Sequence, residues 1–203
     1  SVRQDSTAVF RTLTEFAGGY FRPVQVESEF VLLLDRVREL QPRVIVEIGT
    51  VFGGTLLSYL TVAPEDAMAV SIDLPGGKFG GGYSEARANL FRSFAPGRVH
   101  CLRMDSHSPA TAEALNQVLA GRTVDFLFID GDHSYAGVKQ DFEMYSHLVR
   151  PGGLIAFHDV ARNDEDTQVK VFWDEVKVGR KATEYVHPAD WMCGIGVLDW
   201  EGQ

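Results

Sequence analysis

The sequence has few cysteines, no long apolar run and fewer basic than acidic side chains. Its two cysteines, Cys101 and Cys193, form no CxxC pair, so neither a disulfide framework nor a zinc cluster is expected. No apolar run reaches the roughly 18 residues that a membrane span needs. No secretory signal precedes the expected fold, and we therefore expect a cytoplasmic protein.

The balance of charge limits the expected partners. With 28 acidic and 19 basic residues, the formal net charge is −9. Nucleic-acid binding needs a basic surface that neutralises phosphates, and binding to an anionic membrane needs a polybasic one. We expect neither partner, and a small molecule is the expected ligand. Whether the chain forms a homo-oligomer or belongs to a longer protein is left open.

Short apolar segments alternate with amphipathic ones along most of the chain. A length of 203 residues with 45% hydrophobic residues suits one domain over residues 1–203, in which residues 1–22 form an N-terminal extension. The alternation is typical of an α/β fold with a mainly parallel sheet and helices on both faces. The expected helices are 25–40, 55–60, 84–94, 109–120, 138–149 and 169–176, and the expected strands are 44–48, 67–72, 99–104, 124–129, one from 153, 182–186 and 193–199.

An acidic residue ends or follows each of the first five expected strands. The fourth strand ends in Asp130-Gly-Asp-His133, and the fifth ends in His158-Asp159. In open α/β sheets, ligands bind outside the carboxyl ends of the strands. We therefore expect one site along that edge, formed by the acids Glu47, Asp73, Asp105, Asp130 and Asp159.

The turn after the first strand carries glycines at G-x-x-x-G-G spacing, from Gly49 to Gly53 and Gly54. Glycines let the backbone approach a ligand closely, and the following helix offers free N–H groups. The G-x-G-x-x-G of dinucleotide-binding enzymes is absent, because Val51 stands at the second glycine position. Glu47, just before the turn, would repel a pyrophosphate but suits the cationic amino-acid end of S-adenosylmethionine (SAM).

Polar side chains after the first three strands complete this predicted cofactor site. Thr50 lies in the glycine turn, Asp73 can accept both ribose hydroxyls, and Asp105 and Ser106 are placed for the adenine amino group. Simpler roles stay open for the same positions. The glycines could serve helix–strand packing, Asp73 could cap the loop behind it, and Asp105-Ser106 could form a turn or a helix cap.

Four segments together carry a resemblance to a known family: Val46-Glu-Ile-Gly-Thr, Gly53-Gly-Thr, Asp130-Gly-Asp-His-Ser-Tyr, and Pro151-Gly-Gly followed by His158-Asp. Their order resembles that of class I SAM-dependent methyltransferases, from about residue 25 to 199. A closer resemblance is to the branch of cephalosporin-hydroxylase-like proteins and metal-dependent sugar and natural-product O-methyltransferases. It implies a Rossmann-like, doubly wound sheet of seven strands, mainly parallel with an antiparallel last strand.

The fourth and fifth strand ends predict a divalent-cation site. Hard cations prefer carboxylate oxygens, so Asp130 and Asp159 are the expected ligand pair, and Asp130 is also assigned to the cofactor site. Metal-dependent O-methyltransferases of the catechol type are similar in placing an acid at each of these strand ends, but they usually have two oxygen ligands where this chain has His158-Asp159. His158 could bind the metal, contact substrate or hold Asp159. Mg²⁺ is the expected ion, with Mn²⁺ or another first-row ion as alternatives.

His133, three residues after Asp130, is the predicted general base. Catechol-type enzymes carry a lysine base at the position that the resemblance assigns to His133, and related sugar O-methyltransferases carry a histidine. With an ordinary pKa of about 6.5, a histidine can take a proton at neutral pH. Its simpler role is that of a residue at the start of a helix, bonded to a nearby acid. Asp132 with Ser134 could cap that helix, and Tyr135 could line the cofactor pocket or pack.

The predicted activity is transfer of the SAM methyl group to a hydroxyl of a small molecule, such as a sugar, a glycosylated natural product or a catechol-like diol. Two alternatives remain: an NAD-type oxidoreductase and a non-catalytic SAM-binding accessory domain. The glycine-rich segment 76–82 is expected to be a mobile loop, either a lid over substrate or a flexible connection. Trp191 precedes the last strand, where contact with substrate and ordinary packing are both open.

Overall fold

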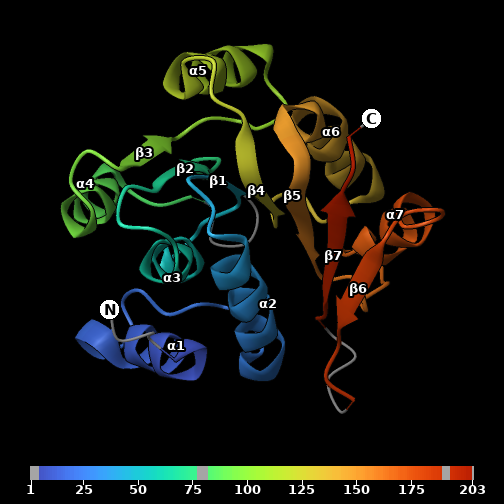
Figure 1. Cartoon of the computed structure of the whole chain (residues 1–203), viewed down its shortest axis with the longest axis horizontal. Helices are drawn as coiled ribbons and strands as arrows, with labels where there is room; N and C mark the ends of the chain where they lie inside the picture. The colour runs from blue at the N-terminus through green and yellow to red at the C-terminus, as the bar shows by residue number, and fades with distance from the viewer. Residues whose placement is uncertain (1–4, 77–81, 189–192, 203) are drawn as a thin grey trace.

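One sheet of seven strands runs through the centre of the computed structural model, which describes residues 5–76, 82–188 and 193–202. The strand order is β3-β2-β1-β4-β5-β7-β6 (Figure 1). Strands β1 to β5 are parallel, and β7 is antiparallel to both of its neighbours, which confirms the predicted fold class. The bounds are β1 Val44–Ile48, β2 Met68–Ile72, β3 Val99–Leu102, β4 Val124–Ile129, β5 Val149–His158, β6 Ala182–Tyr185 and β7 Ile195–Trp200.

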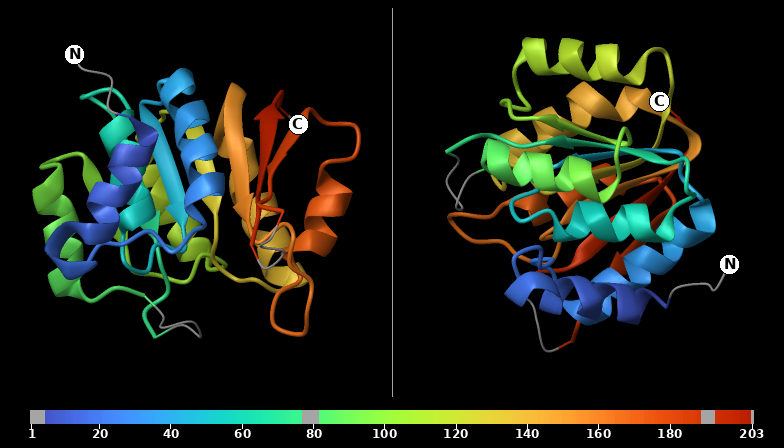
Figure 2. Two further views of the ribbon diagram at one scale, coloured as in Figure 1. Left: turned by 90° about the horizontal axis from the view of Figure 1, so that it is seen from below. Right: turned by 90° about the vertical axis from the view of Figure 1, so that its left-hand side faces the viewer.

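Helices cover both faces of this sheet, and the right-hand view of Figure 2 shows the strands between them. Alternate side chains of a strand point to opposite faces. Ile45 of β1 thus packs with the helices of one face, and Val44 and Val46 pack with those of the other. One face carries α1 Ser6–Glu15, α2 Glu27–Leu40, α3 Gly54–Val62 and α4 Glu85–Phe94; the other carries α5 Pro109–Leu119, α6 Tyr135–Tyr145 and α7 Val169–Val176.

Helix α1 lies inside the predicted N-terminal extension. Asp5 caps it, because its carboxylate accepts a hydrogen bond of 3.1 Å from the Thr7 N–H. Val9, Phe10 and Leu13 are buried in the core that α2 and α3 share. Three apolar residues are too short a pattern to predict a helix without the surface that they cover.

The helix predicted over 138–149 is shorter than expected. Helix α6 ends at Tyr145, a 3-10 turn covers Ser146–Leu148, and β5 begins at Val149, which pairs with Val124 of β4. The prediction is wrong for Val149 because a valine at helical spacing suits a strand equally well. Pro151 and the two glycines after it lie inside β5, where the register with β4 shifts, and do not precede it.

The strand order reverses between β1 and β4, and this reversal positions the site. From β1 the chain proceeds to β2 and β3 on one side, whereas β4 leads to β5 on the other. Ile48 of β1 lies beside Ile129 of β4, which lies beside Phe157 of β5. The residues that follow these three meet at the carboxyl edge, the topological switch point where such sheets bind ligands.

Two further predictions concern segments of the chain as a whole. Within the described ranges, no helix is long and apolar enough to cross a bilayer. Most of the predicted glycine loop, residues 77–81, and also Trp191 lie outside the described residues, so the structure does not bear on either expectation.

Helix α2 offers a direct test of the core. Leu34→Ala should lower the free energy of unfolding by about 2–5 kcal/mol, because Leu34 has no solvent exposure and its truncation leaves a cavity. Leu32→Ala is the matched control on the same helix, since Leu32 is 47% exposed, and it should change stability by less than about 1 kcal/mol. Urea unfolding measures both, and equal losses in the two variants would contradict the packing described.

Candidate active site

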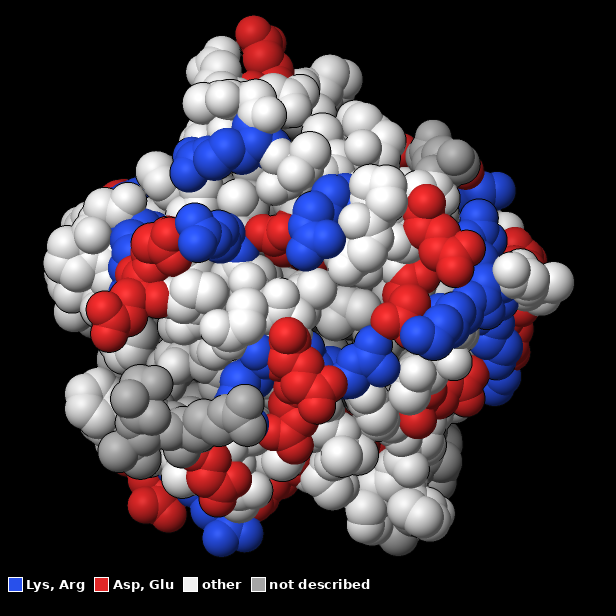
Figure 3. Space-filling view, in the orientation of Figure 1, with Lys and Arg blue, Asp and Glu red and all other residues white. Residues whose placement is uncertain are grey.

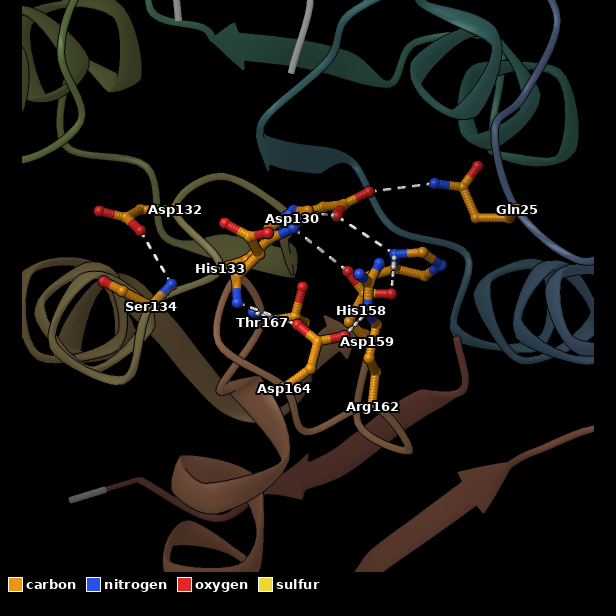
Figure 4. Close-up of polar contacts among 11 residues, drawn as sticks. Gln25, Asp130, Asp132, His133, Ser134, His158, Asp159, Arg162, Asp164 and Thr167 are labelled. Atoms are coloured by element: carbon orange, nitrogen blue, oxygen red, sulfur yellow. Dashed lines mark hydrogen bonds and ion pairs between the residues drawn. The ribbon is translucent and has the colours of Figure 1, made fainter. Parts of the chain in front are cut away.

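Two carboxylates and two imidazoles meet at the ends of β4 and β5 (Figure 4). His133 lies between the acids, with Nε2 3.4 Å from Asp130 Oδ1 and Nδ1 3.4 Å from Asp159 Oδ2. His158 Nδ1 lies 3.3 Å from Asp130 Oδ1 and 3.4 Å from Asp159 Oδ1. The structure thus brings together all four residues that the sequence predicts for the reacting half of the site.

Local backbone geometry holds these side chains at the edge. The Asp130 N–H donates to the Ile48 carbonyl of β1 at 2.8 Å, which extends the β1–β4 ladder past the strand end. Asp159 has a φ of 63°, a left-handed conformation that is uncommon for a residue with a side chain. Such strain persists where surrounding contacts fix it, often at functional sites. In Asp159, it belongs to a carboxylate in contact with both histidines.

The turn after Asp130 prepares the start of α6. Asp132 Oδ1 accepts a 2.9 Å hydrogen bond from the Ser134 N–H, and Ser134 Oγ accepts one of 3.0 Å from the Gly137 N–H. Ser134 is therefore the N-cap of α6, and Asp132 closes the turn before it. Tyr135 packs on Phe172 and donates its hydroxyl hydrogen to Glu175, 2.8 Å away.

The surrounding charges shift the pKa values of both histidines and of Asp130. Burial lowers the pKa of His158, but the charge of Asp130 and hydrogen bonds to both acids raise it well above its ordinary value. The pKa of His133 is also raised, because its bond to Asp130 and the charges of both acids outweigh burial. Burial raises the pKa of Asp130, and the two histidines more than reverse this. Positive charge therefore stabilises the buried carboxylates.

The donor atoms fall into two overlapping groups, each compact enough for one ion, and neither is the predicted set of Asp130, His158 and Asp159. Among the described residues, two groups each have donor atoms within 4.8 Å of one another: Asp130, His133 and Asp159, and separately His158, Asp159 and Cys193. Asp159 belongs to both groups. The sequence suggested only packing for Cys193, which lies far along the chain and carries no motif. Within this geometry, His133 can act as a ligand as readily as His158.

A fifth polar residue, Gln25, comes from the segment before α2 (Figure 4). Its Nε2 donates to Asp130 Oδ2 at 3.0 Å, across 105 residues of sequence, while its own Oε1 is buried without a hydrogen-bond partner within the described part of the chain. A lone glutamine in an irregular segment gives no sequence signal, so its contact with Asp130 depends entirely on the fold.

On the β1 side, Glu47 is fully buried beneath the glycine turn. Its Oε2 accepts a 2.6 Å hydrogen bond from Thr50 Oγ1, which also lies 2.6 Å from Ser71 Oγ. Burial raises the pKa of Glu47 to about 8, against the lowering effect of the Thr50 and Thr55 hydroxyls. Its Oε1 meets no well-oriented donor among the described residues. Glu47 is therefore a fully buried carboxyl group, one oxygen of which lacks a well-oriented hydrogen-bond partner among the described residues.

Asp73 at the end of β2 fastens the same turn. Its Oδ2 accepts hydrogen bonds from the N–H groups of Thr50 (3.1 Å) and Val51 (2.7 Å). Burial raises the pKa of Asp73, and these backbone bonds oppose that effect. Val51 has a φ of 47°, an outlier for a β-branched residue. The Asp73 carboxylate thus holds a strained turn through Oδ2. Its other oxygen, Oδ1, accepts neither the Thr50 nor the Val51 hydrogen bond.

The glycines of the turn are each in close contact with another part of the chain. A Cβ on Gly49 would lie 1.9 Å from the Asp130 carbonyl oxygen. A Cβ on Gly54 would lie 2.2 Å from the Phe21 carbonyl oxygen and from the Pro23 nitrogen. Gly53 has a φ of 82°, and a Cβ there would lie 2.2 Å from the ring of Phe91. The packing role left open for these glycines is therefore present, and a cofactor role remains a prediction.

The third-strand pair, Asp105 and Ser106, lies apart from the cluster. Asp105 is exposed and its Oδ1 accepts a 2.9 Å hydrogen bond from the His107 N–H, which forms a turn before α5. The Ser106 carbonyl accepts a bond from the Tyr145 hydroxyl. Beneath this turn, the buried Asp141 of α6 lies 3.3 Å from His107 Nε2. The sequence analysis did not single out Asp141, although its spacing of three from Val138 and four from Tyr145 places it on the buried face of α6.

Comparison with known proteins decides the family. A family model described as a methyltransferase domain matches residues 46–160, more than half of the chain. The chain belongs to this methyltransferase family. The assignment confirms the resemblance stated from the sequence and favours it over an NAD-type oxidoreductase.

Known structures agree with this methyltransferase domain in fold. The O-methyltransferase from Bacillus cereus in complex with SAH has a TM-score of 0.64 at 21% identity, covering 98% of this chain and 93% of that one. TomG of Streptomyces achromogenes, an O-methyltransferase of tomaymycin synthesis in complex with SAM, has a TM-score of 0.66 at 19% identity, covering 98% and 91%.

A curated relative is longer than this methyltransferase domain. The uncharacterized protein y4gI of Sinorhizobium fredii is 27% identical over 169 residues, which is 81% of this chain but 18% of that protein. The domain therefore spans less than a fifth of that relative's length.

Gly54 permits a test of the contact between the turn and the N-terminal segment. Gly54→Ala should lower the melting temperature by several degrees, because the added Cβ would meet the backbone of Phe21 and Pro23. Gly54 starts α3 with ordinary helical geometry, so alanine itself suits the position. Hydrogen exchange should show faster exchange over residues 20–25 in the variant. Unchanged melting together with unchanged exchange would contradict the contact.

Proposed function

We propose that this domain is an O-methyltransferase that transfers the methyl group of SAM to a hydroxyl of a small molecule with the help of a divalent cation. The observation that carries the proposal is the meeting of Asp130, His133, His158 and Asp159 at the switch point of a methyltransferase fold. Such an edge is where a cofactor and a substrate can meet.

The β1 turn fits the amino-acid end of SAM. Glu47 offers a buried carboxylate with one oxygen open, which suits an ammonium group. Asp73 would hold the ribose hydroxyls through its other oxygen, and Asp105 with Ser106 would contact the adenine. Gly49 and Thr50 would line the methionine part, as would Gly53 and Gly54 from the far end of the turn. When bound, SAM supplies an electrophilic methyl group on a sulfonium centre.

The neighbouring cluster fits a divalent cation. Asp130 and Asp159 supply hard carboxylate oxygens, and His158 supplies a nitrogen close to both. The raised pKa values of the histidines indicate that the site favours positive charge between its acids. Mg²⁺ best matches a carboxylate-dominated set, and Mn²⁺ matches a mixed one. Such an ion would orient two substrate oxygens and favour ionisation of one.

His133 is the proposed general base. Its ring lies between both acids, so the imidazole is held in one orientation. His133 must be neutral to accept the proton of the substrate hydroxyl. We propose that Nε2 is the nitrogen that accepts it. The charge of Asp130 favours the imidazolium that forms. Gln25 holds Asp130 from the opposite side and limits its rotation. Catalysis then rests mainly on positioning the oxygen in line with the methyl group.

The proposed acceptor is a small hydroxylated molecule, such as a sugar, a glycosylated natural product or a catechol-like diol. TomG, with a related fold, acts in tomaymycin synthesis, which supports a small acceptor here. On the face seen in Figure 3, basic and acidic side chains are interspersed and form no continuous basic stripe. That pattern fits a small molecule better than a nucleic-acid backbone.

The pKa of Glu47 predicts how SAM affinity depends on pH. Because burial raises this pKa to about 8, Glu47 is protonated in the free protein at pH 6, and binding an ammonium group should expel that proton. SAM affinity should therefore rise roughly twentyfold between pH 6 and 7.5, with proton release. Glu47→Gln should bind more weakly and show a flat profile. Calorimetry in buffers of different ionisation enthalpy measures both, and no SAM binding at millimolar concentration would reject the proposed cofactor.

Substitutions should distinguish the proposed cation ligand Asp159 from the proposed base His133. Asp159→Asn should weaken Mg²⁺ binding at least about tenfold, because it removes a charged ligand. His133→Ala should keep Mg²⁺ binding and lower turnover about 10²- to 10⁴-fold. The assay follows labelled methyl groups from SAM into a panel of sugars and catechols, with EDTA and added Mg²⁺, and uses the exposed His147→Ala as control.

Other outcomes of this assay would overturn specific parts of the proposal. Full activity in EDTA would reject the cation. Loss of Mg²⁺ affinity in His133→Ala would make His133 a ligand instead of the base. Firm SAM binding without methyl transfer to any member of the panel would favour the accessory-domain alternative.

A further inference from the structure

A second cavity lies beside the glycine turn, on the α4 side. It has a volume of about 250 Å³ and is lined by Tyr20, Phe52, Tyr83, Ser84 and Arg87, among others. Val51 lines this cavity as well as a smaller one that reaches Gln25 and Asp130. The turn that is proposed to hold SAM therefore separates this cavity from the reacting cluster.

Arginine side chains stack on aromatic rings beside this cavity. The guanidinium carbon of Arg87 lies 4.0 Å from the ring centre of Tyr20 and 5.1 Å from that of Phe52. Arg22, from the same segment as Tyr20, lies 4.9 Å from the Phe52 ring centre. These stacking contacts fix the planar guanidinium groups without using their hydrogen-bond donors.

The positive charge at the cavity is not balanced by nearby acids. The two guanidinium carbons can be at most about 10 Å apart, since both lie close to one ring, and this is about one Debye length. Among the described residues that line the cavity there is no carboxylate. Glu85, two positions before Arg87, is paired with Arg92 (2.7 Å) and Arg103 (3.4 Å) instead.

Neither arginine is neutralised elsewhere in the described ranges. The ion pairs found there join no acid to Arg22 or Arg87. Asp73, the acid of the adjoining turn, is bonded to the Thr50 and Val51 N–H groups. A chain of net charge −9 thus keeps two cations beside a cavity with no ion-paired acid among the described residues, which is the arrangement that an anionic ligand completes.

We propose that this cavity binds an oxyanion, a carboxylate or a phosphate attached to a ring, through the guanidinium of Arg87. The inference does not depend on the proposed methyl transfer, since the cavity lies on the other side of the glycine turn from the reacting cluster. Guanidinium forks match both oxyanions in bidentate fashion. The rings of Tyr20, Phe52 and Tyr83 supply walls for the ring to which the oxyanion is attached. Arg22 adds charge on the side that faces the cluster.

The donor geometry favours Arg87 over the hydroxyl groups around it. Tyr83 is buried, and its hydroxyl lies 2.9 Å from Ser71 Oγ, so it presents mainly its ring to the cavity. Ser84 Oγ accepts the Arg87 N–H as the N-cap of α4. We therefore expect Arg87 to provide most of the binding of the oxyanion. Replacing Arg87 should weaken anion binding more than removing either hydroxyl.

The test uses benzoate, phenyl phosphate and the neutral benzyl alcohol as probes of the whole chain. Calorimetry or ligand-observed NMR should show binding of at least one anion and much weaker binding of the alcohol. Arg87→Gln should weaken anion binding at least about tenfold, and Arg87→Lys should weaken it less, since it keeps the charge but not the fork. Arg92→Gln, on the same helix, is the matched control and should bind as the unaltered chain does. Thermal melting checks that each variant is folded.

The results separate this site from the cofactor site. Bound anion should persist when the protein is saturated with SAM, and Arg87→Gln should leave SAM affinity within about twofold of normal. Absence of binding by both anions, equal binding by a folded Arg87→Gln, or displacement of the anion by SAM would each overturn the proposal. If SAM itself does not bind while the anions do, the methyltransferase proposal fails and the oxyanion site stands.

Discussion

Two carboxylates, the buried Asp159 and the partly buried Asp130, lie close together at the ends of neighbouring strands, and much of the site depends on how their charge is balanced. Isolated anions in such a place are costly, and like charges there repel. His133 and His158 each lie near both acids, within 3.3 to 3.4 Å. A site that already needs positive charge is one in which a metal ion can replace protons. The same balance keeps the ring nitrogens of both imidazoles oriented toward the two carboxylates.

The cofactor turn is connected to the proposed oxyanion cavity by a row of hydroxyl groups. Thr50 Oγ1 lies 2.6 Å from both Glu47 Oε2 and Ser71 Oγ, and Ser71 Oγ lies 2.9 Å from the Tyr83 hydroxyl. The row begins under the β1 turn and ends at a wall of the cavity. Rigid hydrogen-bonded elements of this kind hold neighbouring subsites at fixed separation. The proposed cofactor and oxyanion sites therefore share one support instead of two independent loops.

The sequence predicted the parts of the site that follow strand ends, because strand order and a parallel sheet bring such residues to one edge. Asp130, His133, His158 and Asp159 were found in this way, and so was the hydrogen-bonded turn of Glu47. Gln25, Cys193 and Asp141 were not assigned to the site, since their contacts depend on tertiary packing. The same holds for α1, whose three apolar residues become a recognisable face only against α2 and α3. Patterns within a segment are visible in sequence; contacts across 105 residues are not.

The glycines illustrate why a motif and its physical cause can differ. Their spacing suggested an open cradle for a ligand, yet each missing Cβ is replaced by another part of the chain: the Asp130 carbonyl at Gly49, the Phe91 ring at Gly53 and the Phe21–Pro23 backbone at Gly54. The spacing is therefore required by close packing at the switch point, whatever ligand binds there. In the proposed SAM site, selectivity for a cationic cofactor would depend on the acids of the turn, above all on the Glu47 oxygen that lacks a hydrogen-bond partner among the described residues. A cofactor with a pyrophosphate would meet the same glycines but would be repelled by that acid once it ionises.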